Sequence, residues 1–164
     1  MTDAYVVWKT AHVVSAALLF GTGLGIAFFC WFGYRHAIRS GEIGALRAVL
    51  RFTAIADACL TAPAVAFQAL SGLVLMNLLH WPLVSAWSTA VWILYTLVGA
   101  CWLPVVGLQI FLKRDADRAT SVEALPARFH RLFLAWFALG IPAFTAVIAL
   151  FYFMVAKPLA VTGA

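Results

Sequence analysis

Four long apolar runs constrain this sequence more than any other feature. They lie at about 5–32, 52–76, 87–112 and 132–156. A transmembrane helix needs about 20 mostly apolar residues, so each run is long enough to cross a lipid bilayer. Hydrophobic residues make up 65% of the 164-residue chain, and a soluble domain of this size could not bury that much apolar surface. We predict an all-α, four-transmembrane-helix bundle that forms a single integral-membrane domain over residues 1–164.

Basic residues gather around two of the three connections between these runs. The first group is Arg35, Arg39, Arg47 and Arg51, and the second is Lys113, Arg114, Arg118, Arg128 and Arg131. These are nine of the eleven Lys and Arg residues, and the middle connection, 77–86, contains no Lys, Arg, Asp or Glu. Because basic loops stay in the cytoplasm, both termini are predicted on the outer (periplasmic) side of the membrane. We expect a multi-pass protein of the bacterial inner (plasma) membrane.

The net charge of +5 follows from this topology and does not indicate nucleic-acid binding. The expected partner is the lipid bilayer, whose acidic headgroups attract basic segments beside transmembrane helices. Whether the chain forms a homo-oligomer is left open.

Lys9 and His12 lie on one helical face within the first apolar run. Lys9 can extend its ammonium group to the outer interface. His12 lies about 4 to 5 Å deeper, so its imidazole needs a partner within the bundle: a hydrogen-bonding group, a metal or a haem iron. His80, just past the second run, is on the same outer side. It either meets His12 across the first two helices or is a solvated loop residue.

Polar residues also lie near the cytoplasmic side of the bundle. Asp57 is the only acid inside a predicted span, and Gln109 and His130 lie at comparable depth. A buried acid must be paired or stay protonated. Asp57 is therefore either a proton-entry site or one half of an ion pair with an arginine such as Arg51 or Arg131.

Prolines and glycines inside the runs indicate how the helices bend and pack. Pro63, Pro104 and Pro142 each lie within a different predicted span. Proline bends a helix, so these residues predict either a kinked bundle with a cavity or ordinary variation in packing. Gly21 and Gly25 form a small-xxx-small face that predicts close approach of another helix.

Three segments resemble a known family. The segments WKTAHVVSAALLFGTGL (8–24), LTAPAVAFQALSGLVLM (60–76) and HRLFLAWFALGIPAFTAVIALFYFMVAKPL (130–159) resemble helices of the HemJ-type protoporphyrinogen oxidases. The four-helix layout is also similar to the membrane domain of the copper-resistance D proteins. The sequence resembles most closely a domain-of-unknown-function (DUF) family of small bacterial integral-membrane proteins, which share CWLPVVGLQI (101–110) and GIPAF (140–144).

The resemblance to the oxidases implies that His12 is a ligand of b-type haem. Three other motifs of that family are absent, one of them a Pro-Arg pair late in the first helix. Ser88 or Thr89 stands where the oxidases have a lysine, and Leu139 and Gly140 replace an Asn-Glu pair. We therefore do not expect protoporphyrinogen oxidation.

These observations lead to a first functional hypothesis. The chain is expected to be an integral-membrane b-type haem-binding redox protein for electron transfer, with one haem near the outer face. His12 is the expected axial ligand of the haem iron and His80 the expected second ligand, with Lys9 and Lys157 as alternatives. Electrons would pass to or from a quinone or a membrane redox partner.

Two other functions fit the same sequence. The first is a non-catalytic membrane subunit or assembly factor of a larger complex. The second is copper or other metal transport, although the chain has only three methionines, and these form no cluster of soft ligands. Whether the chain is an enzyme stays open.

Overall fold

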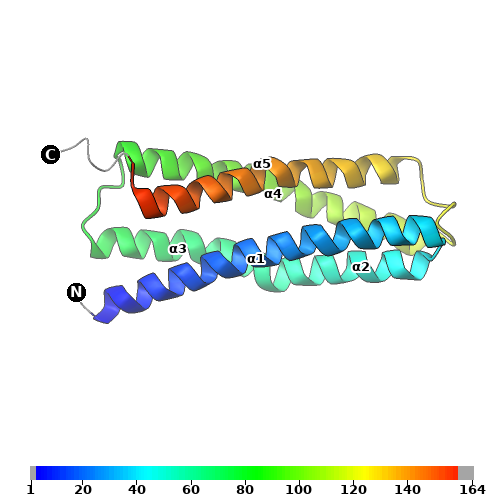
Figure 1. The fold of residues 1–164 in the computed structure, drawn as a ribbon, viewed down its shortest axis with the longest axis horizontal. Helices are drawn as coiled ribbons and strands as arrows, with labels where there is room; N and C mark the ends of the chain where they lie inside the picture. The colour runs from blue at the N-terminus through cyan, green and yellow to red at the C-terminus, as the bar shows by residue number, and fades with distance from the viewer. Residues whose placement is uncertain (1–2, 159–164) are drawn as a thin grey trace.

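The computed structural model describes residues 3–158 and consists of four long antiparallel rods (Figure 1). Its elements are α1 (Asp3–Ser40), α2 (Ile43–Ala56), the π-helical turn η1 (Asp57–Thr61), α3 (Ala62–Leu78), α4 (Ala86–Arg118) and α5 (Arg128–Ala156). Because α2, η1 and α3 follow one another without a break, they form one rod. All four rods are long and apolar enough to cross a membrane. The prediction of an all-α bundle with four spanning helices is confirmed.

The two ends of the bundle differ in composition. Asp3 and Pro158 lie at one end together with the connection 79–85, and we call this the terminal end (Figure 1). The opposite end carries the turn at 41–42 and the connection 119–127, and we call it the basic end. The first and last residues that the structure describes therefore lie at the same end of the bundle. That the basic end faces the cytoplasm stays a prediction from the positive-inside rule.

The helices extend beyond the predicted spans at the basic end. α1 continues to Ser40 rather than ending near residue 32, and α4 continues to Arg118 rather than ending near residue 112. The added turns contain five Arg and Lys residues, which favour helix and can be solvated outside the hydrocarbon: Arg35, Arg39, Lys113, Arg114 and Arg118. Gly41 ends α1 in the left-handed conformation, with φ of 73° and its N–H donating to the Ala37 carbonyl.

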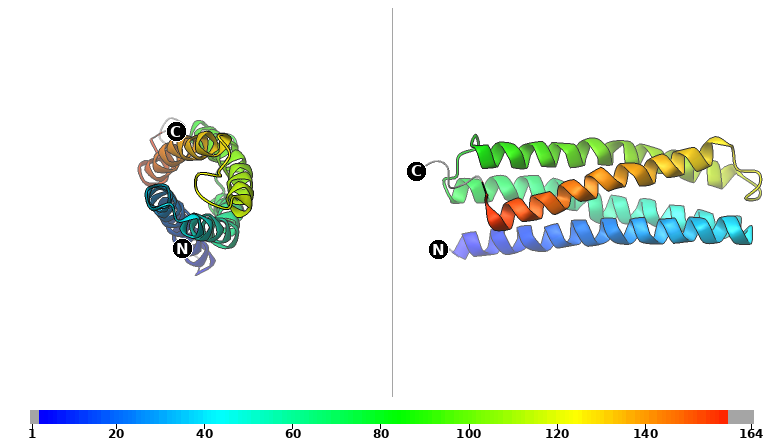
Figure 2. Two further views of the ribbon diagram at one scale, coloured as in Figure 1. Left: turned by 90° about the vertical axis from the view of Figure 1, so that its right-hand side faces the viewer. Right: turned by 45° about the horizontal axis from the view of Figure 1, so that its top comes forward.

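Helix packing places α1 against α2, η1 and α3, and α4 against α5 (Figure 2). The two groups meet mainly where α2 packs on α4, and also where α1 contacts α5. The best-buried apolar cluster lies in the half of the bundle near the basic end. It includes Cys30, Leu46, Leu50, Leu112, Phe129 and Phe133, together with Ala119, Val122 and Leu125 from the connection 119–127. This connection therefore folds back onto the bundle and closes its core.

Two arginines fasten the connection 119–127 to the helices. Arg47 on α2 donates from Nε to the Ala116 carbonyl at 3.0 Å and from Nη2 to the Ala119 carbonyl. These acceptors lie at the end of α4, where the helix dipole favours a cation. Arg128 at the start of α5 binds Asp115 of α4 through two hydrogen bonds, of 2.9 and 2.6 Å. Such a bidentate pair is directional and charge-assisted, so it fixes where α5 begins.

The second rod contains the π-helical turn η1, which lies just before Pro63. Proline has no N–H to donate to the preceding turn, and a π-helical turn is one way for the chain to accommodate that loss. The Ala62 N–H donates to the Asp57 carbonyl, five residues earlier. Pro104 and Pro142 lie inside α4 and α5, which remain continuous.

An apolar cavity of about 540 Å³ opens between α1 and the rod formed by α2 and η1. Gly25 lines this cavity, and a Cβ added at Gly21 or Gly25 would meet nothing within 4 Å. The expectation of close helix packing at Gly21 and Gly25 is therefore wrong within this chain. Close approach occurs instead at Gly33, where a Cβ would lie 2.5 Å from the Val49 side chain. The packing of α1 on α2 depends on that glycine.

Candidate functional site

His12 lies where α1 packs on α3, in the half of the bundle near the terminal end. Its Nδ1 is 2.7 Å from the hydroxyl oxygen of Ser71, a residue with no solvent-exposed surface. The Ser71 hydroxyl donates to the Phe67 carbonyl at 2.6 Å. A serine hydroxyl carries one hydrogen, so the bond with His12 must be donated by Nδ1–H. In the neutral imidazole, Nε2 then carries the free lone pair.

The same helix seam holds other polar contacts. Gln68 donates from Nε2 to the backbone carbonyl of His12 at 2.8 Å, and Ser15 donates to the Ala64 carbonyl at 3.5 Å. Gly72 lies beside the imidazole, where an added Cβ would be 3.7 Å from Cε1 of His12. Polar side chains between apolar helices hold them together, so part of the role of this seam is structural.

His80 does not meet His12 in this structure. It is exposed and follows the end of α3, with a left-handed backbone of φ 48°. Ser71, which marks the level of His12, is seven residues before Leu78, or about 10 Å along the helix. The second ligand expected from the sequence is therefore on the same side of the bundle but at a different level.

The two lysines considered as alternative ligands both lie over aromatic rings. Lys9 Nζ is 5.5 Å from the centroid of the Tyr5 ring, and Lys157 Nζ is 5.1 Å from that of Trp81. A cation over an aromatic face is stabilised there, and aromatic residues favour the membrane interface. These contacts agree with lysines that anchor helix ends.

Asp57 has a different partner from the one expected. It is buried in η1, and its Oδ1 accepts a hydrogen bond of 3.2 Å from the Trp102 indole N–H. Within residues 3–158 the ion pairs join other residues, so the expected pair with Arg51 or Arg131 is wrong. The reason is geometric, because α4 places an indole against η1. The proton-entry role of Asp57 stays a prediction.

The remaining candidates separate from one another. His130 shares a hydrogen bond of 2.7 Å with the Tyr34 hydroxyl at the basic end. Gln109 is buried and lines a cavity near Lys113. Across the described part of the chain, no three His, Cys, Asp or Glu residues lie close enough together to hold a metal ion. Among the candidates, His12 has one ring nitrogen fixed by a buried partner, which leaves Nε2 for a ligand.

Four apolar spanning helices, with basic residues at one end, define a multi-pass integral-membrane protein. Residues 6–158 match the family described as "Predicted integral membrane protein (DUF2269)", and the chain belongs to that family. A search of curated proteins and of solved structures finds no significant match. The family description supports membrane insertion and the expected DUF membership. It carries no link to the HemJ-type oxidases or to the copper-resistance D proteins, so that relation stays a prediction.

Proposed function

We propose that this protein is an integral-membrane b-type haem-binding redox protein in which His12 Nε2 is an axial ligand. The observation that carries the proposal is the hydrogen bond between His12 Nδ1 and Ser71 Oγ. Histidines that bind metals usually donate their other ring N–H to a fixed acceptor, which sets the tautomer and the orientation of the ring. His12 has this arrangement, with Ser71 held in turn by the Phe67 carbonyl.

The surroundings of His12 suit one haem ligand. The imidazole is half-buried between two apolar helices, and Gly72 beside it adds no side chain. Trp8 and Phe67 stack nearby, with ring centroids 6.2 Å apart and an interplanar angle of 15°. A bound haem would supply one-electron redox chemistry, and the protein would tune it through the ligand and its burial.

The second axial position is less defined. His80 remains the proposed second ligand, and its coordination would require the connection 79–85 to move toward His12. By the positive-inside rule the haem would lie near the periplasmic face of the bacterial inner membrane. A quinone in the bilayer or a membrane redox partner would exchange electrons with it.

The direct test is an absorbance spectrum of the full chain, produced in haem-replete cells and purified in a mild detergent. The proposal predicts a Soret band, sharpened α and β bands after dithionite reduction, and close to one haem per chain by the pyridine haemochrome assay. The absence of a Soret band would overturn the proposal. If the Soret band were absent and another protein co-purified in stoichiometric amount, the role of a non-catalytic membrane subunit or assembly factor would be favoured.

A further inference from the structure

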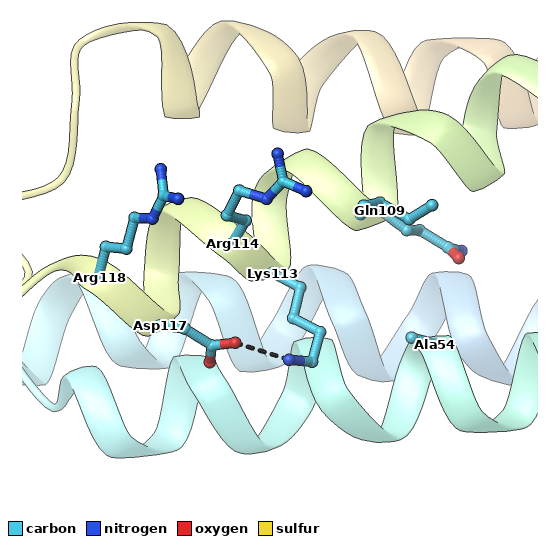
Figure 3. A pocket seen from close by; sticks show the side chains of 7 residues that line it. Ala54, Gln109, Lys113, Arg114, Asp117 and Arg118 are labelled. Atoms are coloured by element: carbon cyan, nitrogen blue, oxygen red, sulfur yellow. Dashed lines mark hydrogen bonds and ion pairs between the residues drawn. The ribbon is translucent and has the colours of Figure 1, made fainter.

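A second cavity lies at the basic end, between α2 and α4, far along the bundle from His12. Its volume is about 300 Å³, and Figure 3 shows the side chains around it. Ala54 of α2 lines one side. The rest comes from two adjacent rows of α4 at four-residue spacing, one containing Gln109 and Lys113 and the other containing Arg114 and Arg118.

The charge in this cavity is not balanced. Lys113 is paired with Asp117, with Nζ and Oδ2 2.6 Å apart (Figure 3). Arg114 and Arg118 form no ion pair or side-chain hydrogen bond with any residue in the range 3–158. Both guanidinium groups extend to the same side of α4 in Figure 3. Two cations on one helix face therefore remain available to an anion.

The cavity also has a polar group at its deeper edge. Gln109 lies one turn closer to the membrane centre than Lys113, and only 6% of its surface is exposed. Its side-chain amide makes no hydrogen bond to another described residue and is not among the fully buried polar atoms, so it is open to the cavity that it lines. Beside it, Ile110 is 56% exposed on the apolar surface of α4. The arginines therefore lie nearest the end of α4, and Gln109 and Ile110 lie next to each other about one turn deeper, Gln109 in the cavity and Ile110 on the apolar surface.

Basic groups near the helix end, with an amide and an apolar side chain one turn deeper, match an amphiphile with a phosphate head. We propose that the cavity binds an anionic phospholipid of the leaflet at the basic end. Its phosphate would lie against Arg114 and Arg118, its glycerol ester region would accept from the Gln109 amide, and its acyl chain would follow Ile110. Basic pockets between transmembrane helices on the cytoplasmic side recognise such headgroups. Arginine suits phosphate because its planar fork can donate two hydrogen bonds.

The test uses native mass spectrometry of the full-length protein in detergent. Delipidated protein is titrated with phosphatidylglycerol, with phosphatidylcholine of the same acyl chains, and with inorganic phosphate. We expect phosphatidylglycerol adducts at concentrations at least tenfold below those needed for phosphatidylcholine. Equal binding of the two lipids would overturn the proposal. Inorganic phosphate that displaced phosphatidylglycerol at equal concentration would also overturn it, because the site would then recognise free phosphate rather than a lipid.

Variants locate the binding on this cavity. The double variant Arg114→Gln/Arg118→Gln should weaken phosphatidylglycerol binding about a hundredfold, since each guanidinium would lose a charge-assisted hydrogen bond to the bound phosphate that contributes about tenfold. Arg35→Gln/Arg39→Gln is the matched control, because it removes two exposed arginines of α1 at the same end. An equal loss in both double variants would show attraction to general positive charge and overturn the proposal. Gln109→Leu keeps every charge and should still weaken binding, whereas wild-type binding by this variant would contradict the assigned role of the amide.

Discussion

Ser71 on α3 holds the imidazole of His12 on α1 through a hydrogen bond of 2.7 Å between Oγ and Nδ1. Ser71 itself is held because its hydroxyl donates to the Phe67 carbonyl one turn earlier. His12 and Ser71 are 59 positions apart in the sequence, so it is the packing of α1 on α3 that brings them together. It selects the ring nitrogen that is available for another partner.

The Ser71→Ala substitution tests the hydrogen bond between Ser71 and the His12 imidazole. Loss of the acceptor for Nδ1–H frees the ring to rotate and to change tautomer. Loss of such a supporting group typically weakens metal binding about ten- to a hundredfold. Haem occupancy after purification, measured by the pyridine haemochrome assay, should fall accordingly. Ser15→Ala on the same seam is the control and should retain haem, because Ser15 does not contact the imidazole and its hydrogen bond to the Ala64 carbonyl is long, at 3.5 Å. Equal occupancy in Ser71→Ala and wild type would contradict the account.

Gly72→Leu tests the space beside the ring. A Cβ at this position would already lie in van der Waals contact with His12, at 3.7 Å from Cε1, so a leucine side chain would crowd the imidazole and any haem on it. We expect loss of the Soret band with retention of the helical circular dichroism spectrum. Gly99→Leu serves as the control, because a Cβ there meets nothing within 4 Å. Full haem occupancy in Gly72→Leu would place the haem elsewhere.

The hydrogen bond between Trp102 and Asp57 should stabilise the π-helical turn. Trp102→Phe keeps most of the ring but leaves the buried Asp57 oxygen without its indole donor, which costs about 1–3 kcal/mol. Asp57→Asn keeps an oxygen that can accept the hydrogen bond from the indole, so its stability should be closer to that of the wild type. Thermal unfolding in detergent, followed by circular dichroism, measures both variants. A larger loss in Asp57→Asn than in Trp102→Phe would mean that the carboxyl group itself has a further role.

The Asp115–Arg128 pair should matter more than the exposed pair between His36 and Glu42. The Asp115 side chain is only 4% exposed, and Arg128 supplies two hydrogen bonds to it. Arg128→Gln should therefore lower the thermal midpoint by several degrees, because it leaves a buried carboxylate unpaired. Glu42→Gln should leave the midpoint unchanged, since both side chains of that pair are 66% exposed. Equal midpoints for the two variants would show that the connection 119–127 is held by its apolar contacts alone.

Membrane orientation can be measured with two introduced cysteines. Val84 is 87% exposed in the connection at the terminal end, and Glu123 is exposed in the connection at the basic end. In intact cells with a permeabilised outer membrane, Val84→Cys should react with a membrane-impermeant maleimide and Glu123→Cys should not. The reverse pattern would place the basic end outside and contradict the orientation drawn from the positive-inside rule.

Hydropathy predicted the four spans because bilayer insertion depends mainly on apolar length. It missed the helical turns beyond them, such as those up to Ser40 and Arg118, because these turns contain charged residues that interrupt the apolar runs. It also missed the core role of the connection 119–127. Val122 and Leu125 were the available signal there, since both are apolar within a polar stretch and both are buried.

For the candidate site, the sequence predicted that certain side chains need partners but did not identify those partners. The sequence indicated that His12 requires a partner, but Ser71 follows from the packing of two helices. For Asp57 the sequence suggested an arginine, whereas the register of α4 supplies Trp102. Pairing across helices depends on rotation and depth, which composition does not determine.

The most direct measurement of the central claim is the reduced-minus-oxidised spectrum of His12→Ala beside that of Lys9→Gln. The two residues lie one turn apart on α1, so the variants perturb the same region of the helix. The account predicts that Lys9→Gln keeps the haem bands, because Lys9 lies over the Tyr5 ring as an anchor. It predicts that His12→Ala loses them, because the ligand nitrogen is gone. Loss of haem in Lys9→Gln alone, or unchanged spectra in both variants, would contradict it.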